Sequence, residues 1–127
     1  KLMADMKHYQ FQVSLEEANM KGNKIYLVKA IKNLIDNAFN YTVKNGKISI
    51  RLEEHLLVIE NQAERVLDET QIQQIFQPFY RPDYSRNRKD GGTGLGLFIV
   101  QQILDKHQFA YKFEAVDGKW MRFSISF

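Results

Sequence analysis

Carboxamide side chains recur along one segment of this sequence at a spacing that suits metal binding. Asn33 and Asn37 lie four residues apart, and Asn40 and Lys44 continue the same line, so in a helix all four would share one face. Asparagine is unfavourable inside a helix, by up to about 0.7 kcal/mol relative to alanine. Its amide oxygen is a hard, neutral ligand, and Mg2+ combines such ligands with water and phosphate oxygens. The repeat therefore indicates either a magnesium–phosphate site or a solvated polar face.

A glycine-rich turn later in the chain could hold an anion. Residues 91–97 read Gly-Gly-Thr-Gly-Leu-Gly-Leu, and apolar residues then recur at helical spacing from Leu97 to Leu104. Glycine lets a backbone approach a phosphate closely. The N-terminus of the following helix would offer N–H groups and the positive end of its dipole. The alternative is a flexible loop without a ligand.

A short basic segment lies immediately before this turn. Arg86, Arg88 and Lys89 stand close together within residues 82–90, and Arg81 precedes them. Arginine forms paired, directional hydrogen bonds to phosphate oxygens. We therefore expect at least one of these side chains to contact a phosphate; otherwise the segment is a solvated basic loop.

The composition limits the class of protein. With 127 residues, of which 44% are hydrophobic and 26% charged, the chain fits one soluble globular domain with a single core. It contains no cysteine, which excludes disulfides and thiolate metal sites. No apolar run approaches the roughly 20 residues that span a bilayer. The net charge of +3 is scattered apart from the basic segment, which disfavours nucleic-acid binding.

The hydrophobic pattern predicts five strands and three helices in one domain. Alternating apolar and polar residues indicate strands, and apolar residues three and four apart indicate helices. The predicted strands are residues 11–15, 48–52, 56–60, 109–113 and 121–127, and the predicted helices are residues 24–42, 69–77 and 94–107. Two strand pairs have connections too short for crossovers. We therefore expect an α/β (α+β) two-layer sandwich, a mixed sheet of about five strands with three helices packed on one face, rather than a doubly wound parallel sheet.

Three motifs in order resemble those of one enzyme family. Residues 33–42, Asn-Leu-Ile-Asp-Asn-Ala-Phe-Asn-Tyr-Thr, resemble the N box of sensor histidine kinases; residues 75–81 resemble the F box, and residues 92–97 the second glycine box. These kinases belong to the GHKL superfamily, together with type II topoisomerases and a mismatch-repair ATPase. The resemblance covers residues 11–127. It implies a Bergerat-type fold that positions Mg-ATP for γ-phosphoryl transfer to a histidine.

The resemblance also implies which residues would hold ATP and Mg2+. Asn37 would ligate the metal, Asn33 would lie near the phosphates, and Tyr41 would lie beside the nucleotide. Asn40 departs from the family, which usually carries Lys or Arg there as a phosphate contact. An ATP lid would span about residues 80–93. The lid and the glycine turn would supply further contacts, with the candidates Arg81, Arg86, Arg88, Lys89, Gly92, Thr93, Gly94, Leu95, Gly96 and Leu97.

Two aromatic residues lie near the start of this lid. Phe76 and Phe79 lie on either side of Pro78. We expect both to pack in the core and at the hinge, where they would hold the base of the lid while its tip moves over the nucleotide.

The motif that binds adenine in this family is altered here. Relatives carry Asp-x-Gly-x-Gly after a central strand, whereas residues 61–65 of this chain read Asn-Gln-Ala-Glu-Arg. We place Asn61 at the Asp position, because strand alternation would turn the competing Glu60 to the other face. An asparagine can accept a hydrogen bond from adenine N6 and donate one to a ring nitrogen. The missing glycines imply either weaker ATP binding or a different path for the turn.

The residue at position 33 bears on the fate of ATP. ATP-hydrolysing relatives place a glutamate four residues before the magnesium ligand, where it activates water. The amide of Asn33 cannot accept a proton at neutral pH. The resemblance therefore favours a protein-histidine kinase over an ATP-hydrolysing enzyme of the same superfamily. A weakly ATP-binding regulatory docking module stays open as an alternative.

The phosphoacceptor histidine of the family has no counterpart in this sequence. His8, His55 and His107 lack the acidic residue and the Pro-Leu that follow it in relatives. We therefore expect it on a separate dimerisation domain, with residues 1–10 as the end of a linker helix. The implied whole protein is a homodimer on the cytoplasmic side of the cell membrane, anchored through other segments, that passes phosphate to a response regulator. The present chain alone would be a monomer.

Overall fold

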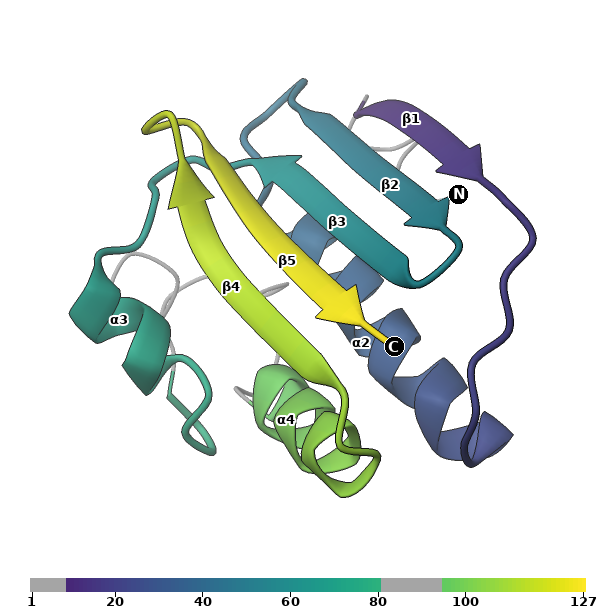
Figure 1. Ribbon diagram of the computed structural model, residues 1–127. Helices are drawn as coiled ribbons and strands as arrows, with labels where there is room; N and C mark the ends of the chain where they lie inside the picture. The colour runs from purple at the N-terminus through teal and green to yellow at the C-terminus, as the bar shows by residue number, and fades with distance from the viewer. Residues whose placement is uncertain (1–8, 81–94) are drawn as a thin grey trace.

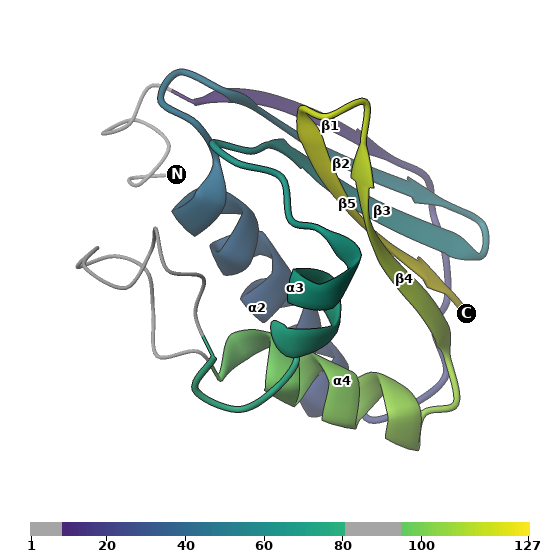
Figure 2. The same cartoon turned by 90° about the vertical axis from the view of Figure 1, so that its left-hand side faces the viewer.

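A five-stranded sheet carries the described helices on one of its faces (Figure 1, Figure 2). The computed structural model describes residues 9–80 and 95–127. The elements in chain order are β1 (Gln10–Leu15), α2 (Lys24–Tyr41), β2 (Lys47–Glu53), β3 (Leu56–Gln62), α3 (Glu69–Gln74), α4 (Gly96–Lys106), β4 (Ala110–Val116) and β5 (Trp120–Ser126). The two-layer α/β sandwich expected from the sequence is confirmed.

The sheet is mixed, and its strand order is β1-β2-β3-β5-β4. β1 pairs parallel with β2, and the other neighbours pair antiparallel. The parallel pair is connected through α2, as a parallel connection requires, while β2–β3 and β4–β5 are hairpins. In the second hairpin, Asp117 and Gly118 have φ values of 56° and 67°, which are the positive values that a type I′ turn needs.

The core lies between the sheet and the two longer helices. Alternation along the strands turns one set of side chains toward the helices, and helical spacing turns the matching set toward the sheet. The buried core residues include Ile48, Ile59, Phe123 and Ile125 from the strands, Leu27, Ala30, Leu34 and Ala38 from α2, and Leu97, Val100, Ile103 and Leu104 from α4. α2 and α4 therefore pack against each other as well as against the sheet.

The starts of α2 and α3 carry the polar groups that helix termini require. At the start of α2, the side chain of Asn23 accepts a hydrogen bond of 3.1 Å from the N–H of Tyr26. At the start of α3, Asp68 and Gln71 form a reciprocal capping box. Within residues 9–80 and 95–127, no helix has the length and apolar character needed to cross a membrane.

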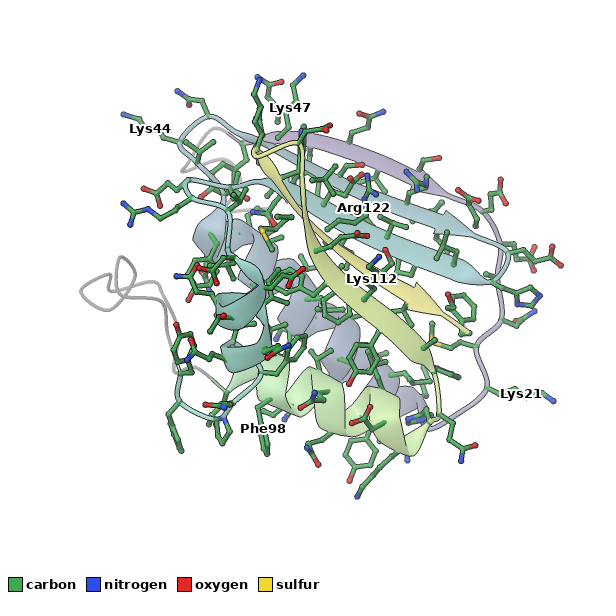
Figure 3. The ribbon with its side chains drawn as sticks, turned by 60° about the vertical axis from the view of Figure 1, so that its left-hand side comes forward. Lys21, Lys44, Lys47, Phe98, Lys112 and Arg122 are labelled. Carbon is green, nitrogen blue, oxygen red and sulfur yellow. The ribbon has the colours of Figure 1, made fainter. Side chains whose placement is uncertain are left out.

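Two expectations from the sequence were wrong. α2 ends at Tyr41, so Lys44 lies beyond the helix in an exposed turn (Figure 3) and does not continue the asparagine face. Phe79 is 71% exposed and has a φ of 67°, so it lies outside the core.

Candidate functional site

A narrow pocket lies between the C-terminal half of α2, the end of β3 and the start of α4. Its lining residues are Asn37, Tyr41, Asn61, Ala63, Arg65, Leu67, Ile75, Leu97, Phe113 and Met121. The free volume is about 20 Å3, which holds about one water molecule. Four of the residues predicted to bind ATP therefore meet here: Asn37, Tyr41, Asn61 and Leu97.

The end of α2 is tied to the end of β3, and this tie positions the polar wall of the pocket. Thr42 is buried, its hydroxyl donates to the carbonyl of Ala38, and it forms an antiparallel bridge with Ala63. Asn37 and Tyr41 lie one helical turn apart just before this bridge, and both are half-buried. The sequence thus places an amide and a phenol opposite the end of β3.

The other two asparagines of the N-box segment lie on the same helix but do not line the pocket. Asn33 and Asn40 are both half-buried residues of α2. Neither belongs to the lining as the pocket stands. Their roles toward phosphate stay predictions.

Asn61 is a polar residue on the apolar floor of the pocket. It is only 5% exposed, and it lies in β3 opposite Met121 of β5. Its amide nitrogen is buried and has no hydrogen-bond partner among the described residues. A buried polar group left without a partner costs about 1–3 kcal/mol. The sequence placed Asn61 after the strand, whereas it is the penultimate residue of β3.

Glu60, the competing candidate for the base contact, points to the opposite face of the sheet. One of its carboxylate oxygens lies 2.9 Å from Nε of Arg122 on β5, and Figure 3 shows Arg122 on that strand. The neighbours of Arg122 in β5, Met121 and Phe123, are buried in the core. The alternation used to choose Asn61 over Glu60 is therefore confirmed.

The turn after β3 follows a path that needs no glycine. Ala63 donates its N–H to the carbonyl of Lys119 at 2.8 Å and pairs with Thr42. Residues 61–65 contain no positive φ value, so the side chains that replace the family glycines are tolerated. Arg65 lines the pocket from an exposed position at its rim.

The start of α4 contributes the third wall. Leu97 is buried and lines the pocket, and Gly96 is the first residue of the helix. The N-cap position is occupied by Leu95, which makes no side-chain capping bond. A Cβ added to Gly96 would have open space around it within 4 Å. The predicted phosphate contacts Arg81, Arg86, Arg88, Lys89, Gly92, Thr93 and Gly94 lie outside the described residues.

Sequence reasoning missed the apolar floor. Leu67, Ile75, Phe113 and Met121 line the pocket, but in the sequence they are indistinguishable from ordinary core residues. Phe76, expected in the core, does pack there, with its ring 6.1 Å from that of Phe113. The floor thus combines one unpaired amide with flat apolar surface, which suits a heteroaromatic base.

The chain matches one protein family over most of its length. Residues 22–127 match the model of the histidine kinase-, DNA gyrase B- and HSP90-like ATPases. Sensor histidine kinase RppB of Synechocystis sp. is 37% identical over 108 residues, which are 82% of this chain and 24% of that protein. The phosphate regulon sensor protein PhoR of Pseudomonas aeruginosa is 34% identical over 122 residues, which are 91% of this chain and 28% of that protein. The chain thus spans about a quarter of these relatives.

Solved structures of histidine kinases share the fold. The mycobacterial sensor histidine kinase MprB superposes with a TM-score of 0.79 at 23% identity, covering 98% of this chain and 88% of that chain. The nucleotide-free catalytic domain of histidine kinase ThkA superposes with a TM-score of 0.73 at 22% identity, covering 97% of this chain and 82% of that chain. Full-length ShkA in complex with AMPPNP superposes with a TM-score of 0.78 at 18% identity, covering 98% of this chain and 26% of that chain.

Proposed function

This chain belongs to the family of histidine kinase-, DNA gyrase B- and HSP90-like ATPases, and we propose that it holds Mg-ATP for transfer of the γ-phosphoryl group to a histidine. The observation that carries this proposal is the amide nitrogen of Asn61, which is buried without a hydrogen-bond partner among the described residues, on the floor of a pocket that Asn37 and the start of α4 also line. The curated relatives are named as sensor histidine kinases and sensor proteins.

The adenine base is proposed to enter at Asn61. Its amide offers one donor group and one acceptor atom, which match adenine N1 and N6. Leu67, Ile75 and Met121 provide apolar surface around the base. The ligand-free volume of about 20 Å3 is too small for a purine, so the walls of the pocket have to move apart on binding.

Mg2+ is proposed to bind the side-chain oxygen of Asn37. The residue is half-buried on the wall of the pocket, one helical turn before Tyr41. A single neutral oxygen suits Mg2+, which takes the rest of its ligands from phosphates and water. When bound, the metal would neutralise the charge on the phosphates. Asn33 lies one turn further from the pocket and would face the phosphate end of the ligand.

The phosphates are proposed to lie against the start of α4. A helix N-terminus offers unpaired N–H groups and a positive dipole end to an anion, and Leu95 supplies no side-chain cap there. Gly96 leaves room for a phosphate to approach the backbone. The basic residues of the lid, which lie outside the described residues, would add charge. Catalysis would then rest on positioning and electrostatic stabilisation, as is general for phosphoryl transfer.

The remaining partners are proposals on the same basis. Asn33 has no group that could activate water, which favours transfer to a protein nucleophile over hydrolysis. We infer that the acceptor histidine belongs to a dimerisation domain, and that a response regulator then takes the phosphate. The whole protein would be a homodimer at the cytoplasmic side of a membrane.

Titration with a non-hydrolysable ATP analogue, with and without Mg2+, tests this function. We expect the Asn37→Ala variant to lose at least about tenfold in Mg2+-dependent affinity, because it removes the metal's protein ligand. Asp36→Ala is the matched control, since Asp36 is exposed on the same helix and should leave affinity unchanged. Equal affinity of Asn37→Ala and the wild type would refute the metal assignment, and absence of binding at millimolar analogue would refute the site.

A further inference from the structure

The proposed base contact in this pocket, Asn61, is an amide rather than a carboxylate. A carboxylate can only accept hydrogen bonds, whereas an amide both accepts and donates. A carboxylate held beside position 6 of a purine therefore favours an amino group there, because it repels a carbonyl oxygen at that position. The amide of Asn61 carries no such restriction.

The two classes of purine present opposite patterns on the edge that Asn61 would meet. Adenine has a donor at N6 and an acceptor at N1, while guanine and hypoxanthine have an acceptor at O6 and a donor at N1. An amide matches the first pattern in one orientation and the second pattern after a half-turn about its terminal bond. Either way it makes two hydrogen bonds.

The strand neighbours of Asn61 do not fix the orientation of its amide. Its amide nitrogen is buried without a hydrogen-bond partner among the described residues. The residues opposite it in the sheet are Ile48 and Met121, which have no group that would distinguish the amide oxygen from the nitrogen. The charged pair Glu60 and Arg122 lies on the other face. The side chain is therefore able to serve both patterns.

We propose that this pocket binds 6-oxopurine nucleoside triphosphates as well as ATP, because Asn61 reads the purine edge with a reversible amide. The inference rests on the proposed nucleotide site and deepens it by naming the substrate class. Hypoxanthine differs from adenine at the edge that Asn61 meets and adds no further group. ITP is therefore the probe that isolates the amide.

The test compares the dissociation constants of ATP, ITP and UTP for the wild-type chain in the presence of Mg2+. We expect ITP to bind within about tenfold of ATP, because both bases make two hydrogen bonds; mismatched buried groups would weaken ITP by more than about tenfold. If ATP bound but ITP bound more than about tenfold more weakly, the inference would be overturned and the proposed nucleotide site would stand. UTP binding as tightly as ATP would also overturn it, because the site would then not distinguish a purine from a pyrimidine. If neither purine nucleotide bound, the inference and the proposed function would fail together.

The Asn61→Asp variant tests whether Asn61 is the group responsible. Held beside position 6 of the base, its carboxylate should raise the ratio of the ITP dissociation constant to the ATP dissociation constant at least about tenfold over the wild-type ratio, since at that position it accepts from N6 but repels O6. An unchanged ratio in a variant with a wild-type circular dichroism spectrum would overturn the assignment. If this variant does not fold, the wild-type comparison still decides. GTP, measured alongside, should follow ITP; binding of ITP without GTP would support the role of Asn61 and limit the site to bases without a 2-amino group.

Discussion

The backbone N–H of Asn23 donates a hydrogen bond of 3.0 Å to Nε2 of His107, which joins the start of α2 to the end of α4. Nδ1 of the same ring lies 2.7 Å from the carbonyl oxygen of Ile103, so Nδ1 is the donor and Nε2 the acceptor. The ring of His107 therefore links the helix that carries the asparagines to the helix that follows the glycine turn.

Gly22 makes this contact possible, and its replacement gives the first prediction. A Cβ on Gly22 would lie 2.2 Å from a carbon of the His107 ring, and the backbone there has a φ of 154°. We expect Gly22→Ala to lower the free energy of unfolding by about 2–4 kcal/mol through this clash and backbone strain. Urea denaturation would measure it.

Gly118→Ala is the matched control for that change. Gly118 also has a positive φ, of 67°, but a Cβ there would have nothing within 4 Å. Its free energy of unfolding should fall only by the cost of holding alanine in a left-handed conformation, about 1–2 kcal/mol. Equal losses in the two variants would show that the His107 contact contributes nothing.

The second prediction separates the two residues that competed for the base. Asn61→Ala should weaken binding of an ATP analogue by about tenfold, because it removes two hydrogen bonds on the pocket floor. Glu60→Gln should change affinity by less than about twofold, because Glu60 bonds Arg122 on the other face. Isothermal titration calorimetry of both variants measures these affinities. A loss of affinity in Glu60→Gln alone would assign the base contact to Glu60 instead of Asn61.

Much of the fold could be predicted from local patterns, because the period of the side chains follows directly from the backbone. Alternation along β3 was enough to turn Asn61 inward and Glu60 outward. The two hairpins followed from their short connections, and the structure confirms both. The predicted helix ends were less accurate: α3 ends at Gln74 rather than at residue 77.

The rest depends on contacts between distant residues that no local pattern contains. The hydrogen bond from Asn23 to His107 joins positions 84 residues apart. The burial of Leu67 and Met121 beneath the pocket depends on how two hairpins and a helix meet. Phe79 is apolar but exposed, whereas Phe76, three residues earlier, is half-buried against the core. Sequence spacing identifies the faces, whereas three-dimensional packing decides which faces meet.

The third prediction concerns pH. Burial raises the pKa of Tyr111, and its hydrogen bond to Asp105 at 2.9 Å raises it further. Its folded pKa thus lies above the unfolded value of about 10, so its contribution to stability is complete below about pH 10 and is lost as pH rises toward the folded pKa. The wild type should exceed Tyr111→Phe in unfolding free energy at about pH 8, and the difference should shrink above about pH 10. Urea denaturation across this range measures it; a constant difference would contradict the prediction.

The last prediction separates the stability of α4 from its proposed role in phosphate binding. Gly96 is the first residue of α4, and a Cβ there would have nothing within 4 Å. Gly96→Ala should therefore raise the free energy of unfolding by about 0.5–1 kcal/mol, because alanine loses less conformational freedom in a helix. The same methyl group would keep a phosphate away from the backbone, so ATP-analogue affinity should fall by about tenfold. Thermal denaturation and titration are measured on the same sample, with Gln102→Ala at an exposed position of α4 as the control that should leave affinity unchanged. A more stable variant with wild-type affinity would place the phosphates elsewhere.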